Sequence, residues 1–213
     1  MRDMRHLPYF LSLAVTLSVC PALADSAPKQ NWEQIDVDDG IRIWKNEIPG
    51  QELPGFRGEV TMDAPLDKVL DAIKDWKQHT KWMHRCAESI EVKHVDENNS
   101  LMYNRTDSPW PVSDRDVLLD TTIDKSADGS TVTLRFKNSN SNAKPVKEDV
   151  VRMPRLVGFY KLVKVSDTKT KVTYQVEANP GGSLPTWLAK RVTKDLPFQT
   201  LDALRARVTG KKS

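Results

Sequence analysis

The chain has little that would cross-link it or draw it toward a charged partner. Its 213 residues include only two cysteines, and 32 basic side chains stand against 29 acidic ones. This near balance of charge gives no electrostatic reason to expect nucleic acid as a partner. The sequence also has few histidines, and it shows no paired carboxylates, no Ser-His-Asp signature and no metal-ligand spacing. We therefore expect no catalytic residue, no metal and no cofactor.

Long hydrophobic runs are also scarce. One apolar run covers residues 7–19, which is too short for an ordinary membrane-spanning helix. It follows Arg2 and Arg5 and precedes small residues at positions 22 and 24, which is the pattern of a secretory signal cleaved after Ala24. A retained N-terminal anchor is the alternative. Lipid attachment at Cys20 would need a small residue before the cysteine. Val19 stands there instead, so we do not expect a lipoprotein. We expect a signal peptide at 1–24 and a periplasmic or secreted protein.

Cleavage would leave 213 − 24 = 189 residues, which is enough for one domain with a sizeable core. We expect a flexible start at 25–30 and a domain at 31–210. The mature chain keeps Cys86 alone, so it cannot form an internal disulfide and its stability must come from packing. No local signature marks this cysteine as a nucleophile, and we interpret it as a small buried apolar residue.

The order of hydrophobic residues predicts an α+β fold. Residues 31–37 could form a short helix. A second helix follows Asp63 as its cap, with Pro65 in the first turn and apolar residues at helical spacing through Trp76. Period-two alternation and turn residues predict strands elsewhere. Because short turns join them, we expect one antiparallel meander. The strands are expected at 40–45, 56–62, 90–95, 101–106, 116–124, 131–136, 150–153, 158–165 and 170–178.

The segment 179–188 predicts an abrupt change from strand to helix. Gly181 and Gly182 allow backbone angles that other residues reach only with strain, and Ser183 is placed to cap a helix with Pro185 in its first turn. The helix should run over 184–208, with one apolar stripe and a kink at Pro197. Such a helix on a curved sheet either fills the concavity or roofs a hollow. The filled core is the commoner outcome.

Four blocks in one order carry a family resemblance. They are Asn-Pro-Gly-Gly-Ser-Leu-Pro-Thr-Trp-Leu at 179–188, Pro-Trp-Pro-Val-Ser-Asp-Arg-Asp at 109–116, Val-Val-Arg-Met at 150–153, and the mid-helix Pro197. Together they resemble START lipid-transfer domains, and in motif most of all phosphatidylcholine transfer protein and secreted bacterial members. The resemblance implies a helix-grip fold: a curved antiparallel sheet wrapped around a long kinked C-terminal helix, with an internal apolar tunnel. It implies that a lipid is bound or transferred and that no reaction is catalysed.

The resemblance and the strand alternation together predict a set of ligand-binding residues, although plain core packing explains each of them as well. Candidate polar anchors are His79, Arg115 and Arg152; the two arginines could equally be structural, paired with Asp116 or Glu148. Where phosphatidylcholine transfer protein holds the phosphate with an arginine, the resemblance places His79 in this chain, and where the sterol-binding branch has an arginine it places Thr121. Neither phosphocholine nor sterol is therefore supported as cargo. The predicted tunnel lining is Tyr103, Leu118, Phe136, Tyr160, Leu162, Tyr174, Val176, Leu188, Val192 and Leu196.

Three functions remain open on the sequence. The first is a carrier that holds a lipid or other apolar small molecule and touches membranes transiently, as a monomer. Because the wider superfamily with this grip fold includes polyketide cyclases, an enzyme is the second. A protein-interaction or chaperone module is the third.

Overall fold

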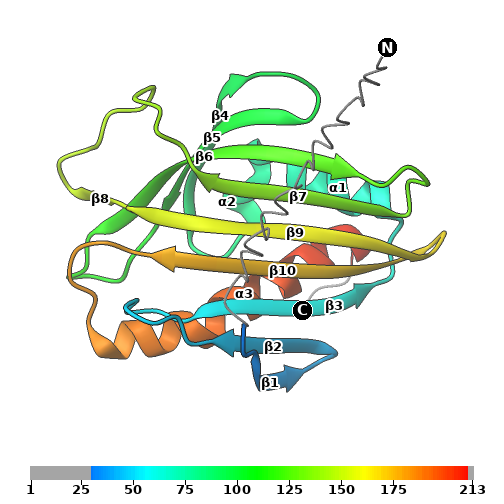
Figure 1. Cartoon of the computed structure of the whole chain (residues 1–213), viewed down its shortest axis with the longest axis horizontal. Coiled ribbons are helices and arrows are strands. Elements are labelled where there is room, and N and C mark those ends of the chain that lie inside the picture. Colours follow the sequence, from blue (N-terminus) through cyan, green and yellow to red (C-terminus); the bar gives the residue numbers. More distant parts are fainter. Residues whose placement is uncertain (1–29, 211–213) are drawn as a thin grey trace, which may run out of the picture. The chain divides into compact units, whose positions relative to one another are not determined.

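The computed structural model describes residues 30–210, apart from the side chains of residue 186 and residues 189–194. The expected signal peptide and the flexible start up to residue 29 lie outside the described residues. Within them, one large sheet is followed by a long C-terminal helix, with a helical segment inserted between the third and fourth strands (Figure 1). The strands are β1 Glu33–Asp38, β2 Ile41–Asn46, β3 Gly55–Met62, β4 Cys86–His94, β5 Asn99–Thr106, β6 Asp114–Lys125, β7 Thr131–Asn138, β8 Val150–Arg152, β9 Arg155–Ser166 and β10 Lys169–Asn179.

The sheet is curved and mainly antiparallel, but it is not the single meander expected, because β3 near the start of the chain pairs with β10 near its end. Its order is β1-β2-β3-β10-β9-β7-β6-β5-β4, so β3 pairs with β10 instead of with β4. The predicted strands, antiparallel pairing and α+β class are confirmed. One exception is β8, which runs parallel to β6 and pairs Asp116 with Arg152 in register.

The short helix expected at 31–37 is wrong, because this segment forms β1. It makes a hairpin with β2 in which Asp38 pairs with Ile41. The two residues between them, Asp39 and Gly40, both have positive φ, at 43° and 75°. An Asp-Gly pair at the tip of a two-residue hairpin is a strong turn signal, and it outweighs the weak helical spacing before it.

The predicted helix after β3 is confirmed as α1, Leu66–Lys74, although its start differs. Pro65 holds the N-cap position and no side chain caps the helix, so Asp63 is not the cap. The buried face carries Leu66, Val69, Leu70 and Ile73, as the spacing indicates. A 3-10 turn, η1 Trp76–Gln78, and a short helix, α2 His79–Trp82, continue toward β4.

The C-terminal helix α3, Thr186–Thr209, runs without interruption through Pro197. Pro185 is its N-cap and no side-chain cap is formed, so Ser183 does not cap it as expected. The helix ends at Gly210, which takes the left-handed conformation at φ 73° and donates its N–H to the carbonyl of Ala206. It packs against α1, β2, β3 and β10 (Figure 1).

The concave face of the sheet is filled at one end and hollow at the other. At the filled end, α1 and the C-terminal part of α3 pack on the sheet. In α3 the residues that do so are Leu201, Leu204 and Val208, which are almost fully buried. Leu162 and Val172 face each other across β9 and β10 in the same cluster. Both outcomes considered from the sequence are therefore realised, at different points along one helix.

Candidate ligand-binding cavity

A cavity of about 240 Å³ lies in the hollow part of the sheet, and most of the described side chains around it are apolar. Its walls come from the inward faces of β5, β6, β7, β9 and β10, from the α2–β4 segment, and from α3 through Leu188 and Leu196. For comparison, an engineered apolar cavity of about 150 Å³ in another protein holds a benzene molecule. The space is therefore large enough for an organic ligand larger than benzene.

Three aromatic rings from neighbouring strands form part of the inner wall. The rings of Tyr160 on β9 and Tyr174 on β10 are stacked, with centroids 4.5 Å apart, and the ring of Phe136 on β7 lies 6.2 Å from that of Tyr160. Gly158 makes room for this arrangement, since a Cβ there would lie 2.6 Å from the Phe136 ring and would overlap the carbonyl oxygen of Gln175. The aromatic wall thus depends on one glycine.

The Tyr160 hydroxyl is buried, and its nearest polar group is the hydroxyl of the stacked Tyr174. Burial holds the pKa of Tyr160 well above the usual value, so the group stays a neutral donor. Tyr160 and Tyr174 therefore place two neutral hydroxyls on a mainly apolar wall.

The structure divides the ten predicted lining residues into three groups. Two do not border the cavity: Leu118 lies on the opposite face of β6, in a small cluster with Leu101 and Tyr103, and Leu162 lies in the filled part of the core. Val192 is outside the described side chains. The residues that do border the cavity are Phe136, Tyr160, Tyr174, Val176, Leu188 and Leu196, together with Tyr103, whose ring nevertheless packs with Leu118 on the other face. Whether any of the ten contacts a ligand stays a prediction.

Other cavity residues were missed because the inward face of two strands was assigned one position out of phase. On β5 and β6 the residues that point inward include Met102, Val117 and Leu119, and Met102 pairs with Leu119 in register. Tyr103 pairs with Leu118 on the other face, where the ammonium of Lys144 lies 4.5 Å from the centre of the Tyr103 ring. Both faces of these strands carry apolar residues, so alternation alone could not choose between them.

His79 borders the cavity as a neutral ring and not as a charged anchor. It is 3% exposed, and its Nε2 lies 2.8 Å from the carbonyl oxygen of Ile73, which assigns the proton to Nε2. Trp76 and Trp82 contact the ring edge-on, with centroids 5.2 and 5.1 Å away. Loss of solvent lowers the pKa of His79 to about 4. At neutral pH this residue contributes no positive charge to a ligand.

Arg115 is the buried cation of the cavity. It is 6% exposed, and its guanidinium donates only to neutral carbonyl oxygens: Nη1 to Ser113 at 2.5 Å, and Nη2 to Gly181 and Ser183 at 3.4 and 3.3 Å. Its Nε is buried without any partner. Loss of solvent lowers the pKa of Arg115 from its usual value. Within residues 30–210, no carboxylate forms an ion pair with it.

Arg152 has the structural role that the sequence left open. Its Nε and Nη2 donate to the two carboxylate oxygens of Asp116 at 2.6 and 3.1 Å, and Asp116 is fully buried. The pair joins β8 to β6, and Arg152 does not border the cavity. A buried carboxylate needs such a partner, so Arg152 is committed to Asp116.

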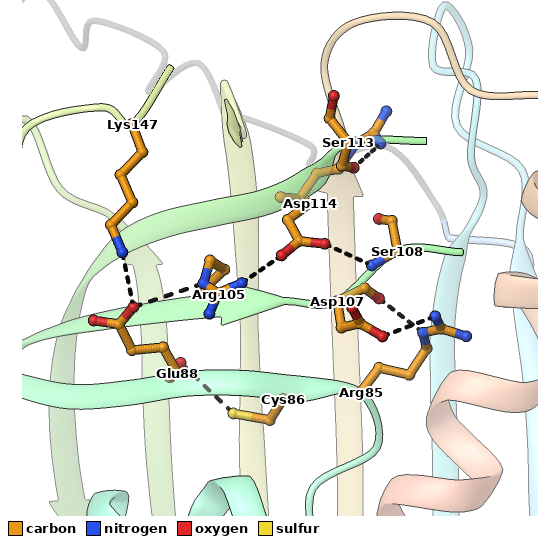
Figure 2. Close-up of polar contacts among 10 residues, drawn as sticks. Arg85, Cys86, Glu88, Arg105, Asp107, Ser108, Ser113, Asp114 and Lys147 are labelled. Atoms are coloured by element: carbon orange, nitrogen blue, oxygen red, sulfur yellow. Dashed lines mark hydrogen bonds and ion pairs between the residues drawn. The ribbon is translucent and has the colours of Figure 1, made fainter. Parts of the chain in front are cut away.

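A row of charged side chains holds the loop between β5 and β6 in place (Figure 2). Arg105 forms ion pairs with Glu88 and Asp114, and Asp114 accepts the backbone N–H of Ser108 at 2.9 Å. Arg85 reaches the same loop by pairing with Asp107 at 3.1 Å. This loop includes part of the cavity wall, so the network helps set the shape of the site.

Cys86 borders the cavity as a buried thiol. The side-chain amide of Asn104 donates to its sulfur at 3.4 Å, and burial raises the pKa of the thiol. A thiol with a raised pKa is a poor nucleophile. The environment thus agrees with a small apolar packing residue, as the sequence indicates.

Two loop segments contribute residues to the cavity wall, and we call them the entrance segments: residues 107–113 and residues 180–188. Each contains residues that border the cavity, such as Pro109 and Leu184, and each carries an exposed tryptophan. Trp110 is 92% exposed and Trp187 is 50% exposed. Each of the two segments that border the cavity thus carries one exposed tryptophan.

The chain belongs to the START domain family, whose model matches residues 29–212. It is 33% identical over 196 residues to an uncharacterized protein of Pseudomonas aeruginosa, covering 92% of this chain and 96% of that protein. A crystal structure of a STAR-related lipid transfer protein fragment from Xanthomonas axonopodis is 34% identical, with a TM-score of 0.75, and covers 84% of this chain and 98% of that one.

Human STARD10 has the same fold at lower identity. Its crystal structure gives a TM-score of 0.75 at 18% identity, covering 84% of this chain and 73% of that one. In sequence, human START domain-containing protein 10 is 24% identical over 135 residues, which are 63% of this chain and 45% of that protein. The helix-grip fold expected from the motifs is confirmed, and family membership connects the cavity with lipid binding and transfer.

Two features are absent from residues 30–210. No helix there is long and apolar enough to cross a membrane. Nor do any three histidine, cysteine, aspartate or glutamate side chains in this range lie close enough together to hold a metal ion.

Proposed function

We propose that this protein binds one lipid or other apolar small molecule in its cavity and transfers it without catalysing a reaction. The observation that carries the proposal is the mainly apolar cavity beneath α3, with the aromatic wall of Phe136, Tyr160 and Tyr174. Exposing a methylene to water costs about 0.8 kcal/mol, so a lipid outside a bilayer needs an apolar container such as this cavity. Membership of the START family supports the same function.

The titratable groups in the cavity favour a carrier over an enzyme. His79 is neutral and its Nε2 is occupied by the Ile73 carbonyl, and the Cys86 thiol has a raised pKa. General acid–base or nucleophilic catalysis needs a group with a matched pKa and a free reacting atom. Neither residue offers this combination.

We further propose that the carrier acts in the periplasm as a monomer and meets membranes through its entrance segments. The signal-like residues 1–24 support the location. The exposed Trp110 and Trp187 support the membrane contact, because tryptophan favours the interface between lipid and water. Fractionation of the native host, and light scattering of the purified mature chain, would test the location and the monomeric state.

Native mass spectrometry of the purified protein tests the binding function. We expect a complex with one apolar molecule per chain, which organic extraction should release for identification. Ala178→Phe, which adds a ring at a cavity-lining position, should reduce occupancy, whereas Val37→Phe on the exposed β1 should not. Protein that is always empty and also refuses fluorescent lipids would contradict the proposal.

A further inference from the structure

Arg115 forms no ion pair with a carboxylate of residues 30–210. Asp114 is its neighbour in sequence, but that carboxylate is bound to Arg105 and to the backbone of Ser108. Glu52 also acts on Arg115 through space, yet it is exposed and forms no ion pair with it. A buried guanidinium normally has a carboxylate partner, as Arg152 does with Asp116. Arg115 lacks one and borders the cavity, so its missing partner can come from a ligand.

The existing hydrogen bonds of Arg115 leave capacity for such a ligand. The two Nη2 bonds to the carbonyls of Gly181 and Ser183 are long, at 3.4 and 3.3 Å, and Nε has no partner. Guanidinium groups bind carboxylates and phosphates with shorter, stronger, charge-assisted bonds. An anion bound to Arg115 would therefore interact more strongly with the guanidinium than the neutral carbonyl oxygens do.

The position of Arg115 would place an anion next to the entrance segments. Its partners Ser113, Gly181 and Ser183 lie in or beside those segments, whereas the apolar wall of Phe136 and Tyr160 comes from β7 and β9. A ligand with a charged end and an apolar body would match this separation. The cavity volume of about 240 Å³ favours a single chain or ring system over a lipid with two long chains.

From these observations, and resting on the carrier function proposed above, we infer that the cargo is a single-chain amphiphile with a compact anionic head. The head is a carboxylate or a phosphate, and Arg115 binds it while the apolar body lies against the aromatic wall. Arg115 is thus the residue that selects the cargo by charge.

Binding of a matched pair of probes tests this inference. Cis-parinaric acid and its methyl ester share one fluorescent chain and differ only in the charge of the head. We expect the acid to bind wild-type protein at least about tenfold more tightly than the ester, because a charge-assisted bond is worth at least that factor. In Arg115→Gln the two should bind within about threefold of each other, with the affinity for the ester unchanged.

Two further variants separate recognition of charge from a structural role. Arg135→Gln removes an exposed cation that does not border the cavity and should leave the preference for the acid intact. Arg115→Lys keeps the charge and should retain much of the preference. If Arg115→Gln and Arg115→Lys both lose the ester as well, Arg115 only maintains the fold at Gly181 and Ser183, and the inference is wrong.

Displacement of the methyl ester identifies the head and the number of chains. Oleic acid, monooleoyl lysophosphatidic acid and monoolein present a carboxylate, a phosphate and a neutral head on the same chain, and dioleoyl phosphatidic acid adds a second chain. We expect one or both single-chain anions to displace best. Equal displacement by monoolein, or stronger displacement by the two-chain lipid, overturns the inference but leaves the carrier function standing. Failure of every probe, the ester included, contradicts the carrier function itself.

Discussion

The Cδ1 atom of Leu201 lies 2.5 Å from the point where a Cβ on residue 58 would be. Gly58 of β3 therefore lets α3 approach the sheet directly, and Leu201 fills the place of the missing side chain. The same point is 3.2 Å from Ile43 on β2, so three elements meet around one glycine. This contact fixes the position of α3 on the sheet. It therefore also positions the N-terminal half of α3, which contributes Leu188 and Leu196 to the cavity wall.

Gly58→Ala should destabilise the protein by about 1–3 kcal/mol, because the added methyl group overlaps the end of a packed leucine. Chemical denaturation of the mature chain would measure the change. The double variant Gly58→Ala with Leu201→Val should recover part of the loss, since it shortens the side chain that is in the way. A single variant as stable as wild type would show that α3 can shift without cost.

His79 should make the stability of the protein depend on pH. Its pKa is about 4 in the folded protein and about 6.5 when unfolded, so the unfolded chain takes up a proton first as the pH falls. The stabilisation is fully present above pH 6.5 and is lost between there and pH 4, by up to about 3 kcal/mol. Urea midpoints from pH 7.5 to 4.5 would follow it.

The controls for this pH effect are two glutamine variants. His79→Gln can still donate to Ile73 but cannot be protonated, so its midpoints should fall less over this range. His94→Gln changes an exposed histidine and should behave like wild type. Parallel curves for wild type and His79→Gln would show that other groups cause the effect.

The buried pair of Asp116 and Arg152 should respond differently to single and double replacement. Arg152→Met leaves a fully buried carboxylate without its partner and should cost about 3 kcal/mol or more in stability. Adding Asp116→Leu should restore much of that loss, because no charge then remains buried. For comparison, Arg135→Met breaks an exposed pair with Asp124 and should have no measurable effect.

Trp110 and Trp187 should control attachment to membranes without affecting binding of the ligand. Trp110→Ser and Trp187→Ser should weaken flotation with phospholipid vesicles, and the double variant should do so most. Affinity for a soluble fluorescent ligand should stay the same, since both side chains are exposed. Unchanged flotation of the double variant would remove these residues from the membrane contact.

The sequence predicted the strands well because each has local alternation and a turn after it. It failed at β1, where the decisive signal was the short Asp39-Gly40 turn, and at two helix starts, where Asp63 and Ser183 have the right chemistry but make no cap. Local pattern also could not show that Leu118 points away from the cavity, because both faces of β6 are buried. Nor could it reveal that Arg152 has a carboxylate partner and Arg115 does not. That difference depends on the parallel pairing of β8 with β6, which no local pattern contains.

The pairing of β3 with β10 also determines the order in which the chain can fold. Met62 pairs with Thr170, which is 170 − 62 = 108 residues further along the chain. During synthesis β1, β2 and β3 can form only a small sheet of their own, and the far side of β3 stays unpaired until β10 exists. Because contacts of such long range form slowly, completion of the sheet is a late event. The cavity, which needs β10 and α3, can therefore exist only after nearly the whole chain has been made.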